Sequence, residues 1–156
     1  MFVAVAMVRC ESVALAASCD SLMSLSLART TITSAQVVAA GAFAPSRGVA
    51  GAPAREFPGA KMLPEFCRVQ GVSKPSTDSH IEFEVWLPVS GWNGKYQGAG
   101  NGGFAGEINY SEMAAALVAG YATASTDTGH QGGPTDAKWA LGGEKNSSSG
   151  RRESWG

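Results

Sequence analysis

The sequence is poor in charge and has no excess of either sign. Charged residues make up 16% of the 156 residues, against about a quarter in an average globular protein. Twelve Lys and Arg oppose thirteen Asp and Glu, which leaves a formal net charge of −1. A nucleic-acid partner requires a basic surplus or stripe, and a membrane span requires roughly 18 consecutive apolar residues. Neither is present, so we expect no nucleic-acid or membrane partner. The length of 156 residues predicts a single domain.

Cysteine is scarce, with three residues and no C-x-x-C spacing, which argues against a zinc site. The apolar runs 2–8 and 13–17, with the small-x-small triplet at residues 14–16, predict a signal peptide over residues 1–16, although Arg9 and Glu11 interrupt it. Its removal takes Cys10 away and leaves Cys19 and Cys67. These two either form a disulfide or remain separate buried thiols. The signal and an even cysteine pair favour a secreted or periplasmic protein.

The clearest element is a strand at residues 80–87 (HIEFEVWL), which holds a period of two over its whole length. Its two faces carry Ile81, Phe83, Val85 and Leu87, and Glu82, Glu84 and Trp86. Further strands are predicted at 68–72, 95–98 and 121–126, an extended or mixed segment at 30–43, and a loop at 45–58. A helix is predicted at 112–119, capped by Asn109 or Ser111 and ended by Gly120.

The order of strand 95–98, loop, helix and strand 121–126 is a βαβ unit, which implies a parallel strand pair and a right-handed crossover. Because an alternating, antiparallel-looking strand precedes it, we expect an α/β fold with a mixed sheet. Residues 143–156 (GEKNSSSGRRESWG) are polar and patternless. They are expected to be a disordered or frameshifted tail.

The glycine-rich loop after residue 97 admits three interpretations. Gly98, Gly100 and Gly103 satisfy G-x-G-x-x-G, and Asp127 follows at roughly the 20-residue spacing of a dinucleotide site. That hypothesis is weak, because residues 104–110 separate the glycines from the helix whose amides would face a pyrophosphate. The second interpretation is an oxyanion-binding loop for acyl transfer. The third is a tight turn without function.

Several motifs occur in order and carry a resemblance: FCRVQGVSKPSTDSHIEFEVWLPVSGWNGKYQGAGNGGFAGEINY, AAALVAGYATASTDTGHQGG and DAKWALG. They resemble the tannase and feruloyl esterase family, over about residues 17–142. The resemblance implies the N-terminal part of a secreted α/β-hydrolase that cleaves small-molecule esters of gallic or hydroxycinnamic acids. The resemblance also implies that the hydrolase needs no cofactor. The family's calcium site lies in a lid outside this chain.

The resemblance also implies roles for particular residues. Cys19 and Cys67 match positions that form a disulfide. Gly102 and Gly103 match the loop that contributes backbone amides to the oxyanion. The loop Asp127 to His130 lies at the same edge of the sheet. Since the family's catalytic His lies farther along its sequence, His130 is expected to have a structural or supporting role.

No G-x-S-x-G nucleophile motif occurs in the 156 residues, whereas the family places its Ser-Asp-His triad beyond the matched region. We therefore expect a gene fragment or frameshifted product that is inactive alone, with strand 95–98 left as an exposed sheet edge. The alternative is a non-catalytic binding module on a hydrolase scaffold.

Overall fold

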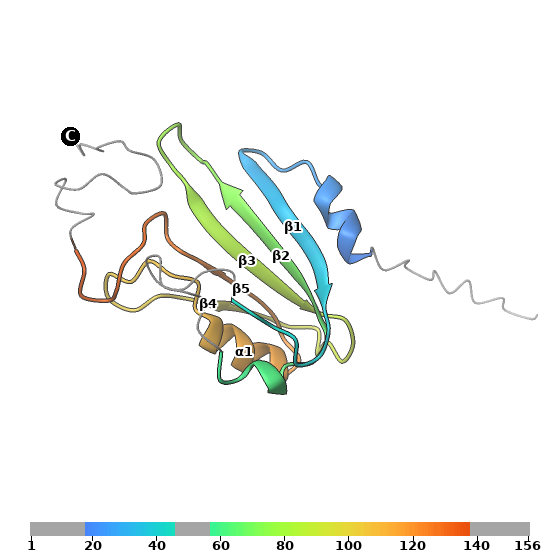
Figure 1. Cartoon of the computed structure of the whole chain (residues 1–156). Coiled ribbons are helices and arrows are strands. Elements are labelled where there is room, and N and C mark those ends of the chain that lie inside the picture. The colour runs from blue at the N-terminus through green and yellow to red at the C-terminus, as the bar shows by residue number, and fades with distance from the viewer. Residues whose placement is uncertain (1–17, 46–56, 138–156) are drawn as a thin grey trace, which may run out of the picture.

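The computed structural model describes residues 18–45 and 57–137, which form one five-stranded sheet with short helices beside it (Figure 1). The expected signal peptide (1–16), most of the expected loop 45–58 and the expected tail (143–156) lie outside the described residues. The strands are β1 (Thr30–Val38), β2 (Phe66–Ser73), β3 (Ile81–Pro88), β4 (Tyr96–Ala99) and β5 (Ala122–Thr126). The helices are the 3-10 turns η1 (Cys19–Ser24) and η3 (Ala60–Met62) and the α-helix α1 (Tyr110–Val118).

The strand order is β1-β2-β3-β5-β4, with only β4 and β5 parallel. The predicted mixed sheet and the predicted parallel pair are therefore confirmed. The helix between that pair begins at Tyr110, two residues earlier than predicted, because Asn109 is the cap. Its side-chain oxygen accepts a hydrogen bond from the Glu112 N–H at 3.2 Å. Gly120, at φ +81°, ends the helix as predicted.

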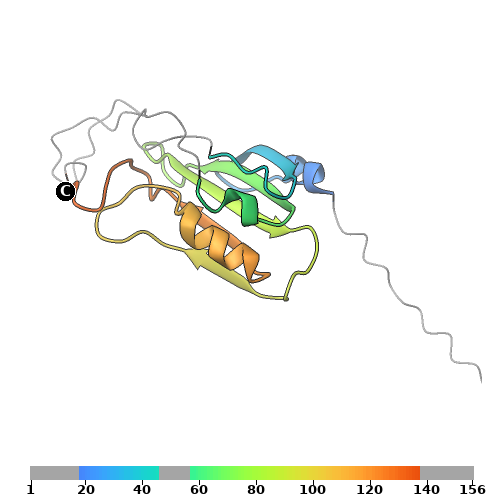
Figure 2. The same cartoon turned by 60° about the horizontal axis from the view of Figure 1, so that its bottom comes forward.

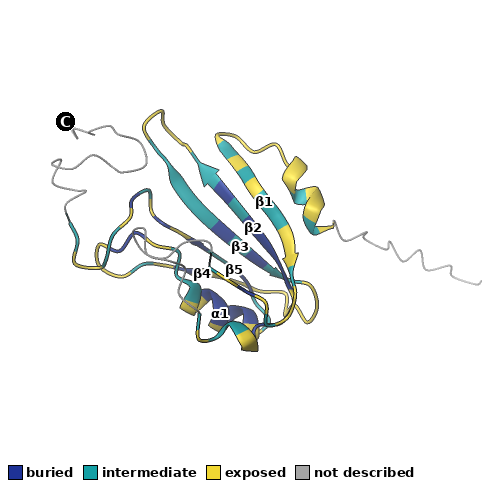
Figure 3. Cartoon of the chain, viewed as in Figure 1, coloured by how far each residue is buried: buried dark blue, intermediate teal, exposed yellow. Residues whose placement is uncertain are grey.

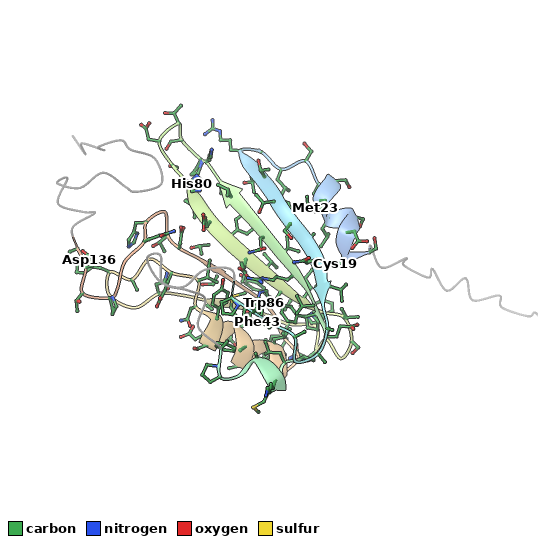
Figure 4. The ribbon with its side chains drawn as sticks, in the orientation of Figure 1. Cys19, Met23, Phe43, His80, Trp86 and Asp136 are labelled. Atoms are coloured by element: carbon green, nitrogen blue, oxygen red, sulfur yellow. A yellow bond between two sulfur atoms is a disulfide. The ribbon has the colours of Figure 1, made fainter. Side chains whose placement is uncertain are left out.

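One face of the sheet is covered by α1 and η3, which Figure 2 shows lying side by side on it. The core between these helices and the sheet contains eight buried apolar residues: Phe43, Leu63, Phe66, Trp86, Ala99, Met113, Ala114 and Leu117. Each large side chain here contributes about 1.5–3 kcal/mol by leaving water. Phe43 and Trp86 pack edge to face at 4.7 Å between the ring centroids (Figure 4).

The alternation of β3 is present, but the more deeply buried face is the one that carries its polar residues. Glu84 and Trp86, under α1, are 3% and 0% exposed. Phe83 and Val85, on the opposite face, are only half-buried. Figure 3 shows both intermediate and buried stretches along β3. Period two therefore predicted the strand correctly, while the side on which the core forms was decided by the placement of α1.

The two edges of the sheet differ. Beside the β1 edge, the disulfide Cys19–Cys67 joins η1 to β2 across 48 positions of sequence, so the pairing implied by the resemblance is present. At the other edge β4 pairs with β5 alone among the described strands, and Tyr96 is 63% exposed. This is the exposed edge expected for strand 95–98.

Candidate active site

The candidate site consists of two loops that leave neighbouring parallel strands. Residues 100–109, called the glycine loop from here on, follow β4, and residues 127–134, called the 127–134 segment, follow β5. The carboxyl ends of parallel strands lie at the same edge of a sheet, so the two loops meet there. In Figure 4 this edge extends toward Asp136, away from Cys19.

The base of the glycine loop is closed by two asparagines. Asn101 donates its side-chain N–H to the Thr126 carbonyl at 3.0 Å, which ties the start of the loop to the end of β5. Asn109 donates its side-chain N–H to the Gly100 carbonyl at 2.9 Å. Both ends of the loop are thus held at fixed positions beside the sheet.

The 127–134 segment runs along the glycine loop and binds its backbone. The N–H of Phe104 donates to the Pro134 carbonyl, and that of Gly106 to the Gly132 carbonyl, both at 3.0 Å. Gly103, at φ +61°, leaves no room for a side chain, since a Cβ would lie 2.5 Å from the Pro134 oxygen.

The backbone donors of the glycine loop fall into two groups. The N–H groups of Phe104, Ala105 and Gly106 all donate hydrogen bonds, that of Ala105 to the Gly102 carbonyl at 3.2 Å. The N–H groups of Gly102 and Gly103, both exposed residues, have no acceptor among the described residues, and the same holds for those of Asn101, Glu107 and Ile108. Gly102 and Gly103 are the two positions that the family resemblance implies as oxyanion donors.

Asp127 is buried at the start of the 127–134 segment, 5% exposed. Burial raises the pKa of its carboxyl, while hydrogen bonds from the backbone N–H groups of Gly129 and Glu82, both 2.9 Å from Oδ1, oppose the rise. Its carboxylate therefore joins the end of β5 to β3, and it is a structural acceptor here.

His130, predicted to have a structural or supporting role, is 9% exposed and lies between the two loops. Its Nε2 is 3.0 Å from the Phe104 carbonyl oxygen and its Nδ1 is 3.2 Å from the Thr128 hydroxyl. Thr128 has a left-handed φ of +58°, an unusual conformation for a β-branched residue. The segment is thus a constrained turn with its imidazole directed at the glycine loop.

A buried polar cluster beneath α1 was missed by sequence reasoning. It consists of Arg68, Gln70, Glu84, Trp86 and Tyr110, and its centre is the Glu84 carboxylate. Arg68 binds this carboxylate through two nitrogens, at 2.8 and 2.6 Å. Gln70, Trp86 and Tyr110 donate to it at 3.0, 3.0 and 2.9 Å. The only signal in the sequence was a glutamate on the same strand face as a tryptophan.

The charges of the buried polar cluster stabilise one another. Burial disfavours the charged guanidinium, but the hydrogen bonds and negative charge of Glu84 outweigh this effect, so the pKa of Arg68 is raised. Burial and the same carboxylate raise the pKa of the Tyr110 hydroxyl, which stays protonated as a donor. Since Tyr110 begins α1, the cluster fixes the helix start directly after the glycine loop.

No three His, Cys, Asp or Glu side chains come together as a metal-binding group within residues 18–45 and 57–137. In the same ranges no helix has the length and apolar character needed to cross a membrane. The dinucleotide interpretation finds no support in the placement of α1, which begins at Tyr110, well after the last glycine of the G-x-G-x-x-G run.

Comparison with known proteins places this sheet and its two loops in a family. A family model described as "Tannase and feruloyl esterase" matches residues 67–153, more than half of the chain, and extends into the expected tail. The chain therefore belongs to the tannase and feruloyl esterase family.

Individual relatives agree with this assignment. An uncharacterized esterase of Xanthomonas campestris pv. campestris is 50% identical over 127 residues, which cover 81% of this chain and 20% of the relative. Feruloyl esterase C of Talaromyces stipitatus is 39% identical over 71 residues, 46% of this chain and 13% of the relative. The chain thus spans at most about a fifth of the length of these relatives.

Solved structures share the fold. The crystal structure of feruloyl esterase B from Aspergillus oryzae superimposes with a TM-score of 0.58 at 30% identity, over 73% of this chain and 22% of that one. A second esterase from Aspergillus oryzae gives a TM-score of 0.61 at 25% identity with the same coverage. The sheet of this chain is thus part of an α/β-hydrolase-like esterase fold.

Proposed function

We propose that this chain supplies the oxyanion side of a serine-type carboxylic-ester hydrolase that acts on small-molecule esters of aromatic acids, feruloyl or galloyl. Family membership supports the ester-hydrolase class. The observation that supports the role of this chain is that the N–H groups of Gly102 and Gly103, both exposed, have no acceptor within the part of the chain that the structure describes. They lie at the carboxyl edge of a parallel strand pair, where an α/β fold places its ligands.

The proposed chemistry requires no cofactor. In acyl transfer a nucleophile attacks the ester carbonyl, and the negative charge that develops on its oxygen needs preorganised donors. Two exposed N–H groups on a loop held by Asn101 and Asn109 meet that requirement. Removal of one such donor typically lowers kcat by about 10²–10³-fold.

We further propose that the protein functions in an oxidising compartment, secreted or periplasmic. The support for this is the Cys19–Cys67 disulfide, since such bonds persist in oxidising environments and are rare in the cytosol.

Activity of the chain by itself is the first test. Since no G-x-S-x-G motif occurs in the 156 residues, we expect the purified chain not to hydrolyse methyl ferulate or methyl gallate. Hydrolysis that a serine-directed reagent abolishes would contradict this expectation.

The oxyanion role is tested in a chimaera of the Xanthomonas campestris esterase whose matching 127-residue segment is replaced by that of this chain. We expect hydrolysis of an aromatic ester. Gly102→Pro removes one of the two N–H groups and is expected to lower kcat by about 10²-fold. Gly102→Ala retains the N–H, and a Cβ there meets nothing within 4 Å, so its loss should be far smaller. Equal effects of both variants would reject a role for the Gly102 amide.

A further inference from the structure

One side chain joins the two loops across 26 positions of sequence. The Nε2 of His130 lies 3.0 Å from the carbonyl oxygen of Phe104. A carbonyl oxygen only accepts hydrogen bonds, so this nitrogen carries a proton and donates. The bond is enclosed, because the imidazole residue is 9% exposed.

The other ring nitrogen has a local partner. Nδ1 lies 3.2 Å from the hydroxyl oxygen of Thr128, two residues away on the same turn. That hydroxyl also donates to the Asp127 carbonyl at 2.7 Å, and it has a single proton to give. The two ring nitrogens thus have different partners: Nδ1 contacts its own turn, and Nε2 reaches the glycine loop.

The accepting carbonyl belongs to a peptide unit that makes a second contact. The C=O of Phe104 and the N–H of Ala105 are the two ends of one planar, trans peptide, so they point in opposite directions. The N–H of Ala105 donates to the carbonyl of Gly102 at 3.2 Å. The imidazole thus sets the plane of the peptide that closes the turn 102–105.

The C=O of Gly102 and the N–H of Gly103 are the ends of the next peptide unit in the chain of hydrogen bonds. Because Ala105 binds the carbonyl end, the N–H of Gly103 points away from the turn. Hydrogen bonds in series also polarise one another. The imidazole proton of His130 therefore connects, through two peptide units, to an amide that has no acceptor among the described residues.

The packing around this path leaves little freedom. A Cβ on Gly106 would lie 2.3 Å from the carbonyl oxygen and 2.7 Å from Cδ2 of His130. The N–H of Phe104 is held by Pro134 on the other side of its residue. Phe104 is thus bound at both its N–H and its C=O by the 127–134 segment.

We propose that His130 is the positioning residue of the glycine loop: its Nε2–H binds the Phe104 carbonyl and, through the Phe104–Ala105 and Gly102–Gly103 peptides, fixes the direction of the Gly103 N–H. The catalytic importance of this orientation rests on the proposed function, in which the Gly103 N–H donates a hydrogen bond to the oxyanion. His130 itself touches no substrate and transfers no proton in the reaction.

Two amide variants of His130 distinguish the contribution of Nε2 from that of Nδ1. The amide nitrogen of His130→Gln takes the place of Nε2, whereas His130→Asn reaches only the place of Nδ1. In the full 156-residue chain we expect His130→Asn to speed hydrogen exchange of the Ala105 amide about three- to ten-fold, the factor for loss of one hydrogen bond. The Gly103 amide resonance should shift with it. His130→Gln should restore both, and the amides of Val69 and Val85 should be unchanged in either variant.

A role in space-filling alone predicts that His130→Leu, which fills the site without a donor, keeps both readouts as well as His130→Gln does. That result, or equal behaviour of His130→Gln and His130→Asn, would overturn the proposal. A second measurement needs no variant and therefore does not depend on how the variants fold. Long-range proton–nitrogen correlation in the wild-type chain should show a proton on Nε2 of His130. An imidazole protonated on Nδ1 alone would overturn the proposal.

These readouts need no ester turnover. A chimaera that fails to hydrolyse aromatic esters rejects the proposed function and leaves the exchange and tautomer results to decide on His130. A hydrolytic chimaera in which His130→Gln and His130→Asn have equal kcat rejects the positioning role alone. We expect His130→Asn to lower kcat while KM stays within about two-fold, and His130→Gln to retain most of kcat.

Discussion

The buried polar cluster and the glycine loop use hydrogen-bond donors in opposite ways. In the cluster, Glu84 accepts bonds from four side chains, and its charge is balanced by that of Arg68. In the glycine loop, Gly102 and Gly103 present N–H groups with no acceptor among the described residues.

The difference follows from the cost of leaving each kind of group without a partner. A charge in the cluster is far from water and costs several kcal/mol unless it is paired. An exposed amide costs little, because water binds it until another acceptor takes its place. Under α1 the Glu84 carboxylate and its donors are thus all bound, whereas the carboxyl edge of β4 and β5 combines bound backbone groups with exposed amides that have no acceptor among the described residues.

The largest effect is expected from opening the buried polar cluster. Glu84→Ala leaves the Arg68 guanidinium buried without its counter-charge and removes the acceptor of three further side chains. We expect the free energy of unfolding to fall by about 3–5 kcal/mol, measured by urea denaturation of the full chain.

The matched control for this variant is Glu65→Gln, which changes an exposed carboxylate just before β2. Its effect should stay within about 0.5 kcal/mol. If the two variants had similar stability, Glu84 would not be the centre of the cluster, and the contrast with the glycine loop would fail.

Like the buried polar cluster, the Cys19–Cys67 disulfide stabilises the fold away from the glycine loop. Replacing Cys19 and Cys67 together by Ser should lower the free energy of unfolding by about 2–4 kcal/mol, because the unfolded chain regains the freedom of a long loop. The effect should disappear when both proteins are measured in reductant. A difference that persists in reductant would assign the loss to packing of the thiols.

Asp127 makes the carboxyl edge sensitive to pH. Burial raises the pKa of its carboxyl in the folded state, so the folded state favours the protonated form. Its contribution to stability is fully present below the ordinary Asp pKa of about 3.9 and is lost as the pH rises through the raised value. Asp127→Asn keeps the Oδ1 acceptor for Glu82 and Gly129 and does not titrate.

We therefore expect the stability of Asp127→Asn relative to wild type to increase as the pH rises from below 3.9 toward neutrality. Parallel urea titrations at several pH values measure it. Asp127→Ala should cost about 1–3 kcal/mol, since two backbone donors lose their acceptor. A relative stability that falls with rising pH would contradict the assignment.

The smallest effect concerns the one buried side-chain polar atom without a partner in the part of the chain that the structure describes, the hydroxyl of Thr123 on β5. Thr123→Val replaces it by a methyl group of similar shape. Removing an unsatisfied hydroxyl from a fully buried site should leave stability unchanged or raise it by about 1 kcal/mol. A clear loss in thermal denaturation would mean that the hydroxyl is bound.

The sequence was informative where the physics is local. The period of two at residues 80–87, the Asn109 cap and the Gly120 stop depend on backbone geometry over a few residues, and all three are confirmed. The order of elements around the glycine loop predicted the parallel pair, because two strands joined through a helix run in the same direction. The family motifs implied the Cys19–Cys67 pairing, which spacing alone left open.

What the sequence by itself determined is thus four of the strands, the α-helix, one parallel strand pair in a mixed sheet and, through its motifs, the family. The antiparallel order of β1, β2, β3 and β5 came from the tertiary structure. Only the tertiary structure decided which face of β3 is buried, how Glu84 is satisfied by residues from three elements, and which glycine-loop amides are available. The reason is that these depend on distances between segments up to 45 positions apart, such as the bond from Glu82 to Asp127. A pattern of neighbouring residues carries no information on such distances.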